Sequence, residues 1–451
     1  MLDHLAADEM KSATQPMSGN LSQLVEGLHD ARRHTLALVA DLNDEQLIGP
    51  RLEIVNPMLW EIGHVAWFQE YWVLRHLQGR LPILENGDAL YDSAKVAHET
   101  RWDLLLSRRK TLEYMQEVLD RITDQYQRQE RIDSQAEYFL SLALFHEDMH
   151  DEAFGYTRQT LGYSKPCFGE RGAAPASDGM TVSEDLKDAL ILGEAFLLGS
   201  VPDRPFVFDN EMDAHEVHVE PFAIARTAVT NAKFAAFVDA RGYERAEFWS
   251  DAGWRWRQTV NAQHPVYWQR DGGEWLYREF DQLVPLEGSL PVLHVNWYEA
   301  ESYCRWAKRR LPTEAEWEMA ASTEPNDDRT AISNRKRRFP WGDEPPTATR
   351  ANLDCRAGGR IDVRALPESD SAFGCRQMIG NVWEWTASDF NPYPGFKPGP
   401  YKEYSAPWFG DHKVLRGGCW TTRSRMIHNA YRNFYKPDRR DVWAGFRTCA
   451  L

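Results

Sequence analysis

The stretch that decides the fold of the first half of the chain is Ala136–Phe154, AEYFLSLALFHEDMHDEAF. Its apolar residues recur every three or four positions, and it contains no glycine or proline, which predicts a long helix of a bundle. His146 and His150 lie four residues apart within it. Both imidazoles therefore share one helix face, one turn apart, as two ligands of a single metal ion would.

Outward from this stretch, the first half has further segments with periodic apolar faces. One of them carries His64 on the same face as Trp60 and Phe68. A lone histidine on such a face is more often a hydrogen-bonded core residue, but metal sites in bundles are commonly built from facing helices. We therefore predict three histidine ligands on two helices of a four-helix bundle. The predicted helices are Leu24–Leu42, Pro57–Gln78, Ser93–Ile122 and Ser134–Leu161.

Two other interpretations of the histidines are weaker. The residues His146 to His150 also read H-E-x-x-H, the zinc-protease pattern in which the glutamate is the general base, but the extended metzincin string is absent. A lectin-like binding protein with a structural zinc would normally close the site with a fourth protein ligand. No further histidine or cysteine lies near the three on either helix, and helical geometry places Glu147 and Asp151 off the histidine face.

Composition narrows the class of protein. A length of 451 residues predicts two or three domains. The net charge of -16 argues against nucleic acid or an anionic membrane as partner. No apolar run approaches 18 residues, and residues 1–20, expected to be a disordered tail, lack the apolar region of a signal peptide, so we expect a cytoplasmic protein. Six cysteines without a C-x-x-C favour reduced thiols. The sequence leaves the oligomeric state open.

Residue composition and predicted secondary structure change once along the chain. After the helical region, residues 21–165, a segment rich in glycine, alanine, serine and proline predicts a linker over 166–190. Residues 191–451 are rich in tryptophan and glycine and predict an irregular α+β domain. Its clearest elements are two alternating stretches and two helices: Ala195–Ser200, His215–Glu220, Asn231–Ala240 and Trp297–Arg309.

Six ordered motifs in the second half carry a resemblance to a known family. They are Thr227–Asn231, Pro291–Trp297, Arg310–Glu318, Gly380–Trp385, Leu415–Trp420 and Ala444–Arg447. Together they resemble the formylglycine-generating-enzyme or sulfatase-modifying-factor fold, a C-type-lectin-like α+β domain, and the first half resembles a DinB-like four-helix bundle. The pairing resembles the sulfoxide synthases of ergothioneine biosynthesis and their ovothiol and selenoneine relatives.

The resemblance implies a function for the metal. It assigns His64, His146 and His150 to a non-haem Fe(II), with O2 as co-substrate. Hercynine, the trimethylated betaine of histidine, would receive sulfur or selenium at C2 of its imidazole. Three imidazoles leave open positions for oxygen and substrates, as an oxygen-activating iron requires. Hercynine would lie against Asn433, Phe434 and the second-domain aromatics, since aromatic faces hold quaternary ammonium groups.

The chain departs from the ergothioneine pattern at the residues that the resemblance assigns to the donor. His98 stands in place of an arginine and Tyr435 in place of an aspartate that bind gamma-glutamylcysteine, while Arg439 is retained and Arg101 is the other cation left nearby. Losing a guanidinium removes a bidentate carboxylate clamp. A neutral selenosugar donor, bound by hydroxyl-bonding and stacking groups such as His98, Tyr435 and Phe434, is therefore the preferred prediction, and ergothioneine sulfoxide synthase using cysteine or gamma-glutamylcysteine is the alternative.

Two further departures concern catalysis. Phe390 occupies the position of the family's catalytic tyrosine and cannot donate its proton. We therefore assign the catalytic role to Tyr393 of the same turn. Met149 replaces the glutamine that some family members use near hercynine, and we expect it to contact the substrate.

Overall fold

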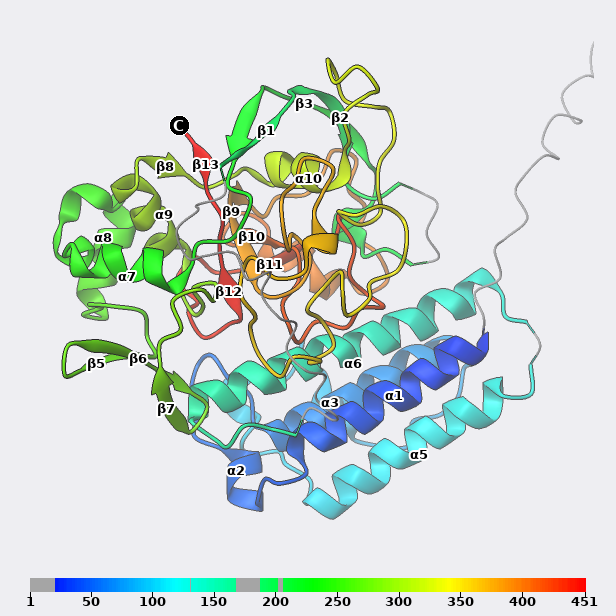
Figure 1. Ribbon diagram of the computed structural model, residues 1–451. Coiled ribbons are helices and arrows are strands. Elements are labelled where there is room, and N and C mark those ends of the chain that lie inside the picture. The colour runs from blue at the N-terminus through cyan, green and yellow to red at the C-terminus, as the bar shows by residue number, and fades with distance from the viewer. Residues whose placement is uncertain (1–20, 130, 168–186, 202–205) are drawn as a thin grey trace, which may run out of the picture.

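The computed structural model describes residues 21–129, 131–167, 187–201 and 206–451, and Figure 1 shows them as a helical bundle beneath a larger mixed domain. The predicted tail, residues 1–20, and most of the predicted linker, 166–190, lie outside the described residues. No helix within the described ranges is long and apolar enough to cross a membrane.

Four long helices form the bundle, as the apolar periodicity predicts. They are α1 (Leu21–Val39), α3 (Met58–Gln69), α5 (Arg108–Tyr126) and α6 (Ser134–Leu161), with short helices α2 (Asp44–Ile48) and α4 (Gly87–Tyr91) between them. Helix α3 continues as a π-helical segment, Glu70–His76. Helix α6 begins at the Asp133 N-cap and ends at Gly162, whose left-handed conformation favours glycine.

The third helix begins later than predicted. Periodicity suggested Ser93–Ile122, but α5 starts at Arg108, after the Ser107 side chain accepts a hydrogen bond from the backbone of Lys110. Upstream, the Asp92 carboxylate accepts hydrogen bonds from the Ala94 backbone and the Lys95 ammonium. Such local side-chain bonds compete with helix formation, so the chain runs here as a connection with one 3-10 turn, His98–Thr100.

The second domain is built from short strands and helices around an aromatic core. One four-stranded sheet has the order β1-β4-β13-β8, a second has the order β11-β10-β9-β12, and β2-β3 and β5-β6-β7 form smaller antiparallel sheets. The strands are β1 (Ala189–Ile191), β2 (Glu194–Leu198), β3 (His215–Val219), β4 (Phe222–Ile224), β5 (Trp268–Asp271), β6 (Glu274–Glu279), β7 (Gln282–Pro285), β8 (Arg309–Arg310), β9 (Trp383–Asp389), β10 (Lys413–Arg416), β11 (Asn433–Tyr435), β12 (Ala444–Gly445) and β13 (Cys449–Ala450).

This domain contains more helix than predicted. The two expected helices are present as α7 (Asn231–Asp239) and α9 (Trp297–Trp306), but α8 (Asp251–Thr259) and α10 (Glu314–Ser322) were not expected. Helix α10 starts with a capping box in which Thr313 and Glu316 bond reciprocally. That signal lies within the motif Arg310–Glu318 and could have identified the helix.

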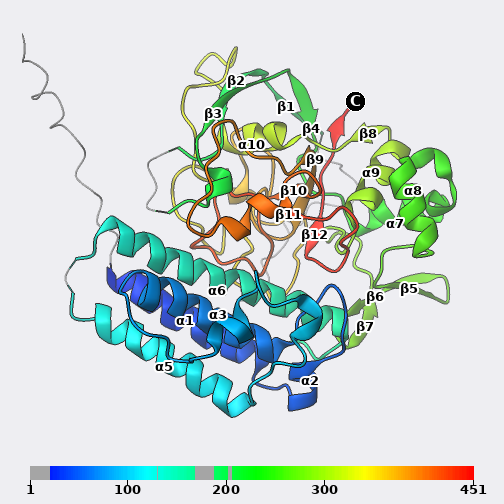
Figure 2. The same ribbon diagram turned by 180° about the vertical axis from the view of Figure 1, so that it is seen from behind.

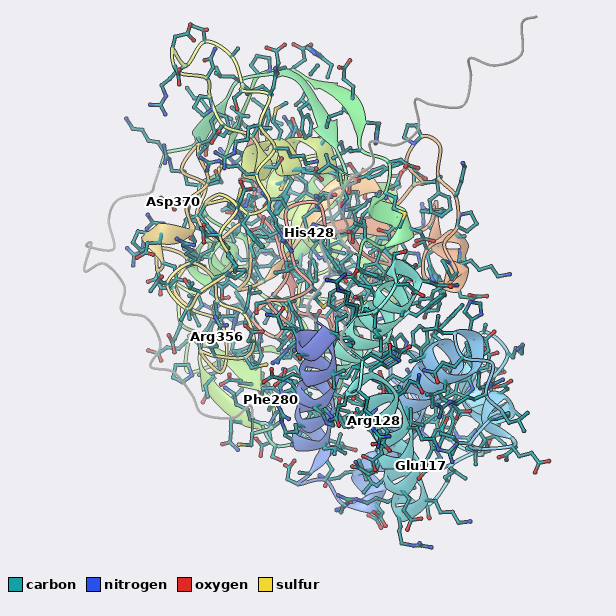
Figure 3. The ribbon with its side chains drawn as sticks, turned by 90° about the vertical axis from the view of Figure 1, so that its right-hand side faces the viewer. Glu117, Arg128, Phe280, Arg356, Asp370 and His428 are labelled. Carbon is teal, nitrogen blue, oxygen red and sulfur yellow. The ribbon has the colours of Figure 1, made fainter. Side chains whose placement is uncertain are left out.

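Helix α6 is the bundle helix on which the second domain rests, and Figures 1 and 2 show it directly beneath that domain from both sides. Near its middle, the Asp148 carboxylate accepts two hydrogen bonds of 2.7 and 2.6 Å from Arg425. Near its end, Gln159 accepts a hydrogen bond of 2.6 Å from the backbone of Phe280, a residue labelled in Figure 3. These bonds fix the metal-site helix against the second domain along its length.

Candidate metal centre and substrate cavity

Three histidines meet between α3 and α6. His64 comes from α3, and His146 and His150 from successive turns of α6. One nitrogen from each lies within 4.8 Å of the other two, and the Nε2 atoms of His146 and His150 are 3.3 Å apart. The structure therefore brings together the three ligands predicted from the sequence, although no spacing rule links His64 to the other two.

The outer ring nitrogens have different environments. Nδ1 of His64 lies 2.7 Å from the carbonyl oxygen of Tyr91, and Nδ1 of His150 lies 2.6 Å from a carboxylate oxygen of Glu61. Nδ1 of His146 is buried without a hydrogen-bond partner in the described structure, and its ring stacks on Phe68 at 3.6 Å. Partners on Nδ1 orient a histidine so that Nε2 can bind a metal.

Electrostatics also suit metal binding. Burial lowers the pKa of His64 and of His146 well below the usual range of histidine. Both rings are therefore neutral near pH 7, which is the form that coordinates a metal. Three imidazoles that meet between α3 and α6, with two of them lining a cavity, fit a ferrous ion that keeps its remaining positions for other ligands.

The acidic residues between the histidines point elsewhere. Glu147 is fully buried in the bundle, where its carboxylate accepts hydrogen bonds from Arg32 at 2.8 Å and Gln69 at 2.6 Å. Asp151 accepts a bond of 2.6 Å from Thr35. Within the described ranges, the three histidines have no fourth His, Cys, Asp or Glu in their group. Glu147 is thus no general base for a protease, and the centre lacks the closure of a structural zinc site.

A cavity of about 640 Å³ lies over the histidines, between α6 and the second domain. His146, His150 and Glu61 form part of its wall, and the Tyr401 ring lies 5.9 Å from that of His146. Trp408, which is 41% exposed, stands on its rim. The other residues around it are Asn56, Ser93, Ala94, Met149, Glu152, Ala153, Tyr156, Trp383, Glu403, Tyr404, Pro407, Thr422, Met426, Tyr431, Asn433, Phe434 and Tyr435.

The described residues of this wall include acidic side chains but no lysine or arginine. Glu61, Glu152 and Glu403 face the cavity. The Glu152 carboxylate accepts hydrogen bonds from Trp383 at 2.6 Å and Thr422 at 2.7 Å. Burial raises the pKa of the lining tyrosines above the usual value, so their hydroxyls stay protonated. The wall therefore offers hydroxyls, aromatic faces and negative charge.

Several residues predicted from the sequence meet at this cavity. Met149 lines it from α6, between the two histidines of that helix. Asn433, Phe434 and Tyr435 line it from β11, which pairs antiparallel with β10. Their roles in substrate binding remain predictions, but their positions beside the histidines agree with them.

His98 and Arg101 are not among the residues that line the cavity. Nε2 of His98 is 2.8 Å from the backbone oxygen of Val55. The Arg101 guanidinium donates a hydrogen bond of 2.7 Å to Asn56, which does line the cavity. It also lies 4.2 Å from the centre of the Trp60 ring, which stacks on His64.

Arg439 and Phe390 also support wall residues from behind. Arg439 donates hydrogen bonds of 2.7 and 2.6 Å to Asp441, and its charge is thereby paired. Phe390 is fully buried and stacks on Phe434 at 4.0 Å. Neither side chain lines the cavity.

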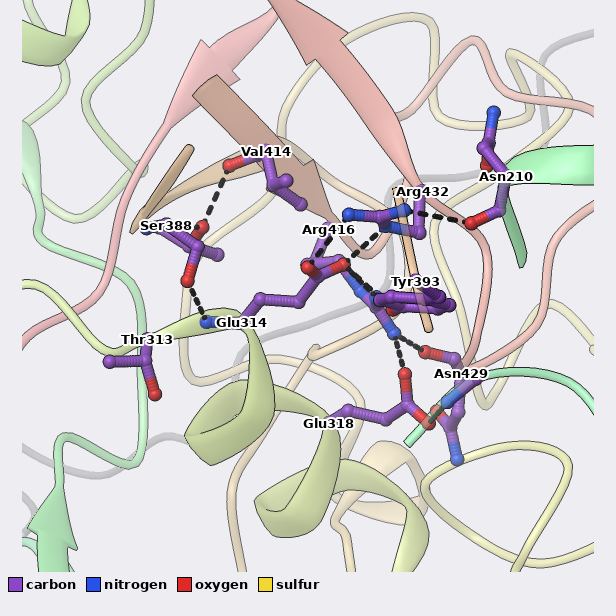
Figure 4. Close-up of polar contacts among 12 residues, drawn as sticks. Asn210, Thr313, Glu314, Glu318, Ser388, Tyr393, Val414, Arg416, Asn429 and Arg432 are labelled. Carbon is purple, nitrogen blue, oxygen red and sulfur yellow. Dashed lines mark hydrogen bonds and ion pairs between the residues drawn. The ribbon is translucent and has the colours of Figure 1, made fainter. Parts of the chain in front are cut away.

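Tyr393 is not at the metal centre, so its expected catalytic position is incorrect. Its hydroxyl donates a hydrogen bond of 3.2 Å to Glu314 of α10, and the Arg432 guanidinium lies 4.0 Å from the centre of its ring (Figure 4). Arg416 binds the same carboxylate at 2.7 Å. The turn that carries Tyr393 therefore points it into a buried ion cluster of the second domain.

Sequence reasoning missed other wall residues. Glu152 follows Met149 by three residues along α6, and Tyr156 follows Glu152 by four, so helical geometry could have found them. Tyr401 and Met426 come from irregular segments of the second domain, and no local pattern marks them.

The comparisons with known proteins agree with this architecture. The family model described as Sulfatase-modifying factor enzyme 1-like domain matches residues 181–450, and that of the DinB superfamily matches 28–153. The chain is 37% identical to a hercynine oxygenase of Mycolicibacterium thermoresistibile, covering 94% of each chain. It is 36% identical to a hercynine oxygenase of Mycobacterium tuberculosis, covering 94% of this chain and 98% of the relative.

A relative that shares only the second domain is the formylglycine-generating enzyme of Streptomyces coelicolor, 32% identical over 57% of this chain and 87% of the relative. Fold and site therefore define a two-domain protein in which a DinB bundle and a sulfatase-modifying-factor domain enclose a three-histidine centre. Within that class, the chain belongs to the hercynine oxygenase family. The predicted resemblance and fold class are confirmed.

Proposed function

We propose that the protein is an O2-dependent non-haem iron enzyme that forms a carbon–selenium bond at C2 of the hercynine imidazole, with a selenosugar as donor. The observation that carries the choice of donor is the absence of lysine and arginine from the described cavity wall. A ferrous ion held by His64, His146 and His150 would supply oxygen activation and a site for the chalcogen.

The cavity offers a place for the cationic end of hercynine. A quaternary ammonium has no N–H to donate, so it binds to aromatic faces and negative charge. Glu152 supplies a buried carboxylate, held by Trp383 and Thr422, and Tyr431 and Tyr435 line the same cavity. Asn433 supplies an amide for the carboxylate of hercynine, whose imidazole then faces the three histidines.

The same wall disfavours a dicarboxylate donor. The two cations that the sequence suggested for it are occupied: Arg439 is paired with Asp441, and Arg101 is held by Asn56 and Trp60. A carboxylate of gamma-glutamylcysteine would be desolvated near glutamates without a counter-ion, at a cost of several kcal/mol. A neutral sugar would instead use the tyrosine hydroxyls and amides as hydrogen-bond partners.

The second candidate is an ergothioneine sulfoxide synthase using cysteine or gamma-glutamylcysteine. It is favoured by the full-length similarity to hercynine oxygenases at 36 and 37% identity. The difference between the two candidates lies in the donor and leaves the proposed acceptor and metal unchanged.

A competition experiment separates these candidates. Iron-loaded protein is incubated in air with hercynine and equal amounts of a selenosugar, cysteine and gamma-glutamylcysteine, and the products are identified by mass spectrometry. We expect the selenium product to dominate. In the variant Tyr435→Arg, which places a cation on the wall, use of gamma-glutamylcysteine should rise, whereas Tyr435→Phe should not raise it. Faster turnover of gamma-glutamylcysteine by the unmodified protein would establish the ergothioneine alternative.

A further inference from the structure

A second cavity, of about 280 Å³, adjoins the substrate cavity at the junction of bundle and second domain. Met426 and Tyr431 line both cavities, so these two side chains form the partition between them. Both are buried, with 5% and 3% of their surface exposed. The two spaces are therefore neighbours separated by one layer of side chains.

One face of α6 forms part of both cavities. Ser141 and Phe145 line the second cavity, and Met149, Glu152 and Tyr156 line the substrate cavity. Residues three or four apart lie on the same side of a helix, so this series follows one continuous stripe. The cavities are thus two sections of one groove between α6 and the second domain, and His146 lines the larger of them.

The second section is mainly apolar within. Its wall includes Leu144, Phe145, Phe206, Phe208 and Met426. The polar and charged residues of the wall are Gln23, Glu137, Ser141, Glu211, Arg338, Arg425, His428 and Tyr431. Arg425 is paired with Asp148 and with Asp30, to which it donates a bond of 2.7 Å, and His428 lies 3.3 Å from a carboxylate oxygen of Glu211. The apolar side of this cavity can take up small apolar guests such as xenon. The thioether of Met426 is flexible enough to let such a guest pass.

We infer that the second cavity is a binding and entry site for dioxygen, which reaches the metal centre past Met426 and Tyr431. The inference rests on the proposed function, in which O2 is a substrate. Hercynine and a donor sugar would together occupy the larger cavity and its rim at Trp408, so a small apolar gas needs a separate approach. The stripe on α6 provides one that leads into the cavity lined by His146.

Ser141 allows a matched test, since it is 4% exposed and lines only the second cavity. Ser141→Phe fills the space, whereas Ser141→Ala removes the hydroxyl without filling it. Leu144→Phe is a second filling variant, and thermal unfolding identifies any variant that does not fold. Crystals of each protein are pressurised with xenon, the oxidation rate of the bound ferrous ion by O2 is measured without substrates, and the KM for O2 is measured with them.

We expect xenon in this cavity in the unmodified protein and in Ser141→Ala, and none in Ser141→Phe. The filling variants should oxidise their iron several-fold more slowly and show a several-fold higher KM for O2, with an unchanged KM for hercynine. Absence of xenon from the unmodified protein, or unchanged iron oxidation in a folded filling variant, overturns the inference. Lack of hercynine turnover would refute the proposed function instead, because xenon binding and iron oxidation need no hercynine.

Discussion

Glu61→Gln should weaken metal binding through His150. The carboxylate of Glu61 lies 2.6 Å from Nδ1 of His150, and Glu61 is only 2% exposed, so water does not replace it. Glutamine keeps a hydrogen-bond acceptor of the same shape but removes the charge. A bond to a charged group contributes about 1.5–3 kcal/mol and a neutral one about 0.5–1.5 kcal/mol, so the change costs about 1–1.5 kcal/mol, or roughly tenfold in affinity.

The assay is anaerobic competition for Fe(II) between the protein and a chromophoric chelator. Glu53→Gln is the matched control, because Glu53 is exposed and five residues before the start of α3. We expect Glu61→Gln to bind iron about tenfold more weakly and Glu53→Gln to bind it as the unmodified protein does. Equal affinity in all three proteins would show that the carboxylate does not support the ligand.

Three further predictions concern metal retention, pH and stability. Replacing His64, His146 or His150 singly by alanine should remove most of the iron, measured by metal analysis after gel filtration; stoichiometric iron in any of them contradicts the assignment. Burial lowers the pKa of His34 to about 4, so the unfolded chain takes up a proton before the folded protein does as the pH falls. The free energy of unfolding, measured with urea, should therefore fall by up to about 3 kcal/mol between pH 6.5 and 4. His34→Gln should reduce this dependence of stability on pH. Glu318→Gln should lower the free energy of unfolding by about 3–5 kcal/mol, because the buried Arg416 loses the negative charge of one partner. Glu117→Gln removes a charge from an exposed ion pair and should lower the free energy of unfolding by less than about 1 kcal/mol. Equal losses in the two variants would refute this difference.

Local patterns predicted the parts of the site that lie on regular elements. The i, i+4 spacing gave His146 and His150, and the apolar face of α3 gave His64, because helix periodicity fixes which side chains share a side. The order of motifs in the second half predicted its fold class. The start of α5 was missed because the polar bonds of Asp92 override the apolar pattern of the following segment.

The rest of the site depends on how the two domains meet, which no local pattern encodes. Tyr401 and Met426 reach the cavity from irregular segments of the second domain. Tyr393 was misplaced because its position in the turn does not reveal that the Glu314 carboxylate binds it. Arg439 looks like a free donor-binding cation in the sequence, and only the fold shows its bidentate pairing with Asp441.

Oxygen consumption tests whether the three histidines hold a ferrous ion that activates oxygen for hercynine. Protein reconstituted with one equivalent of Fe(II) is placed in an oxygen electrode with donor, with and without hercynine, beside the variant His146→Ala. We expect hercynine-dependent oxygen uptake in the unmodified protein, with carbon–chalcogen product formed in step, and neither in the variant. Sustained uptake without hercynine, beyond the oxygen that oxidises the iron once, or uptake that survives in His146→Ala, would contradict this function.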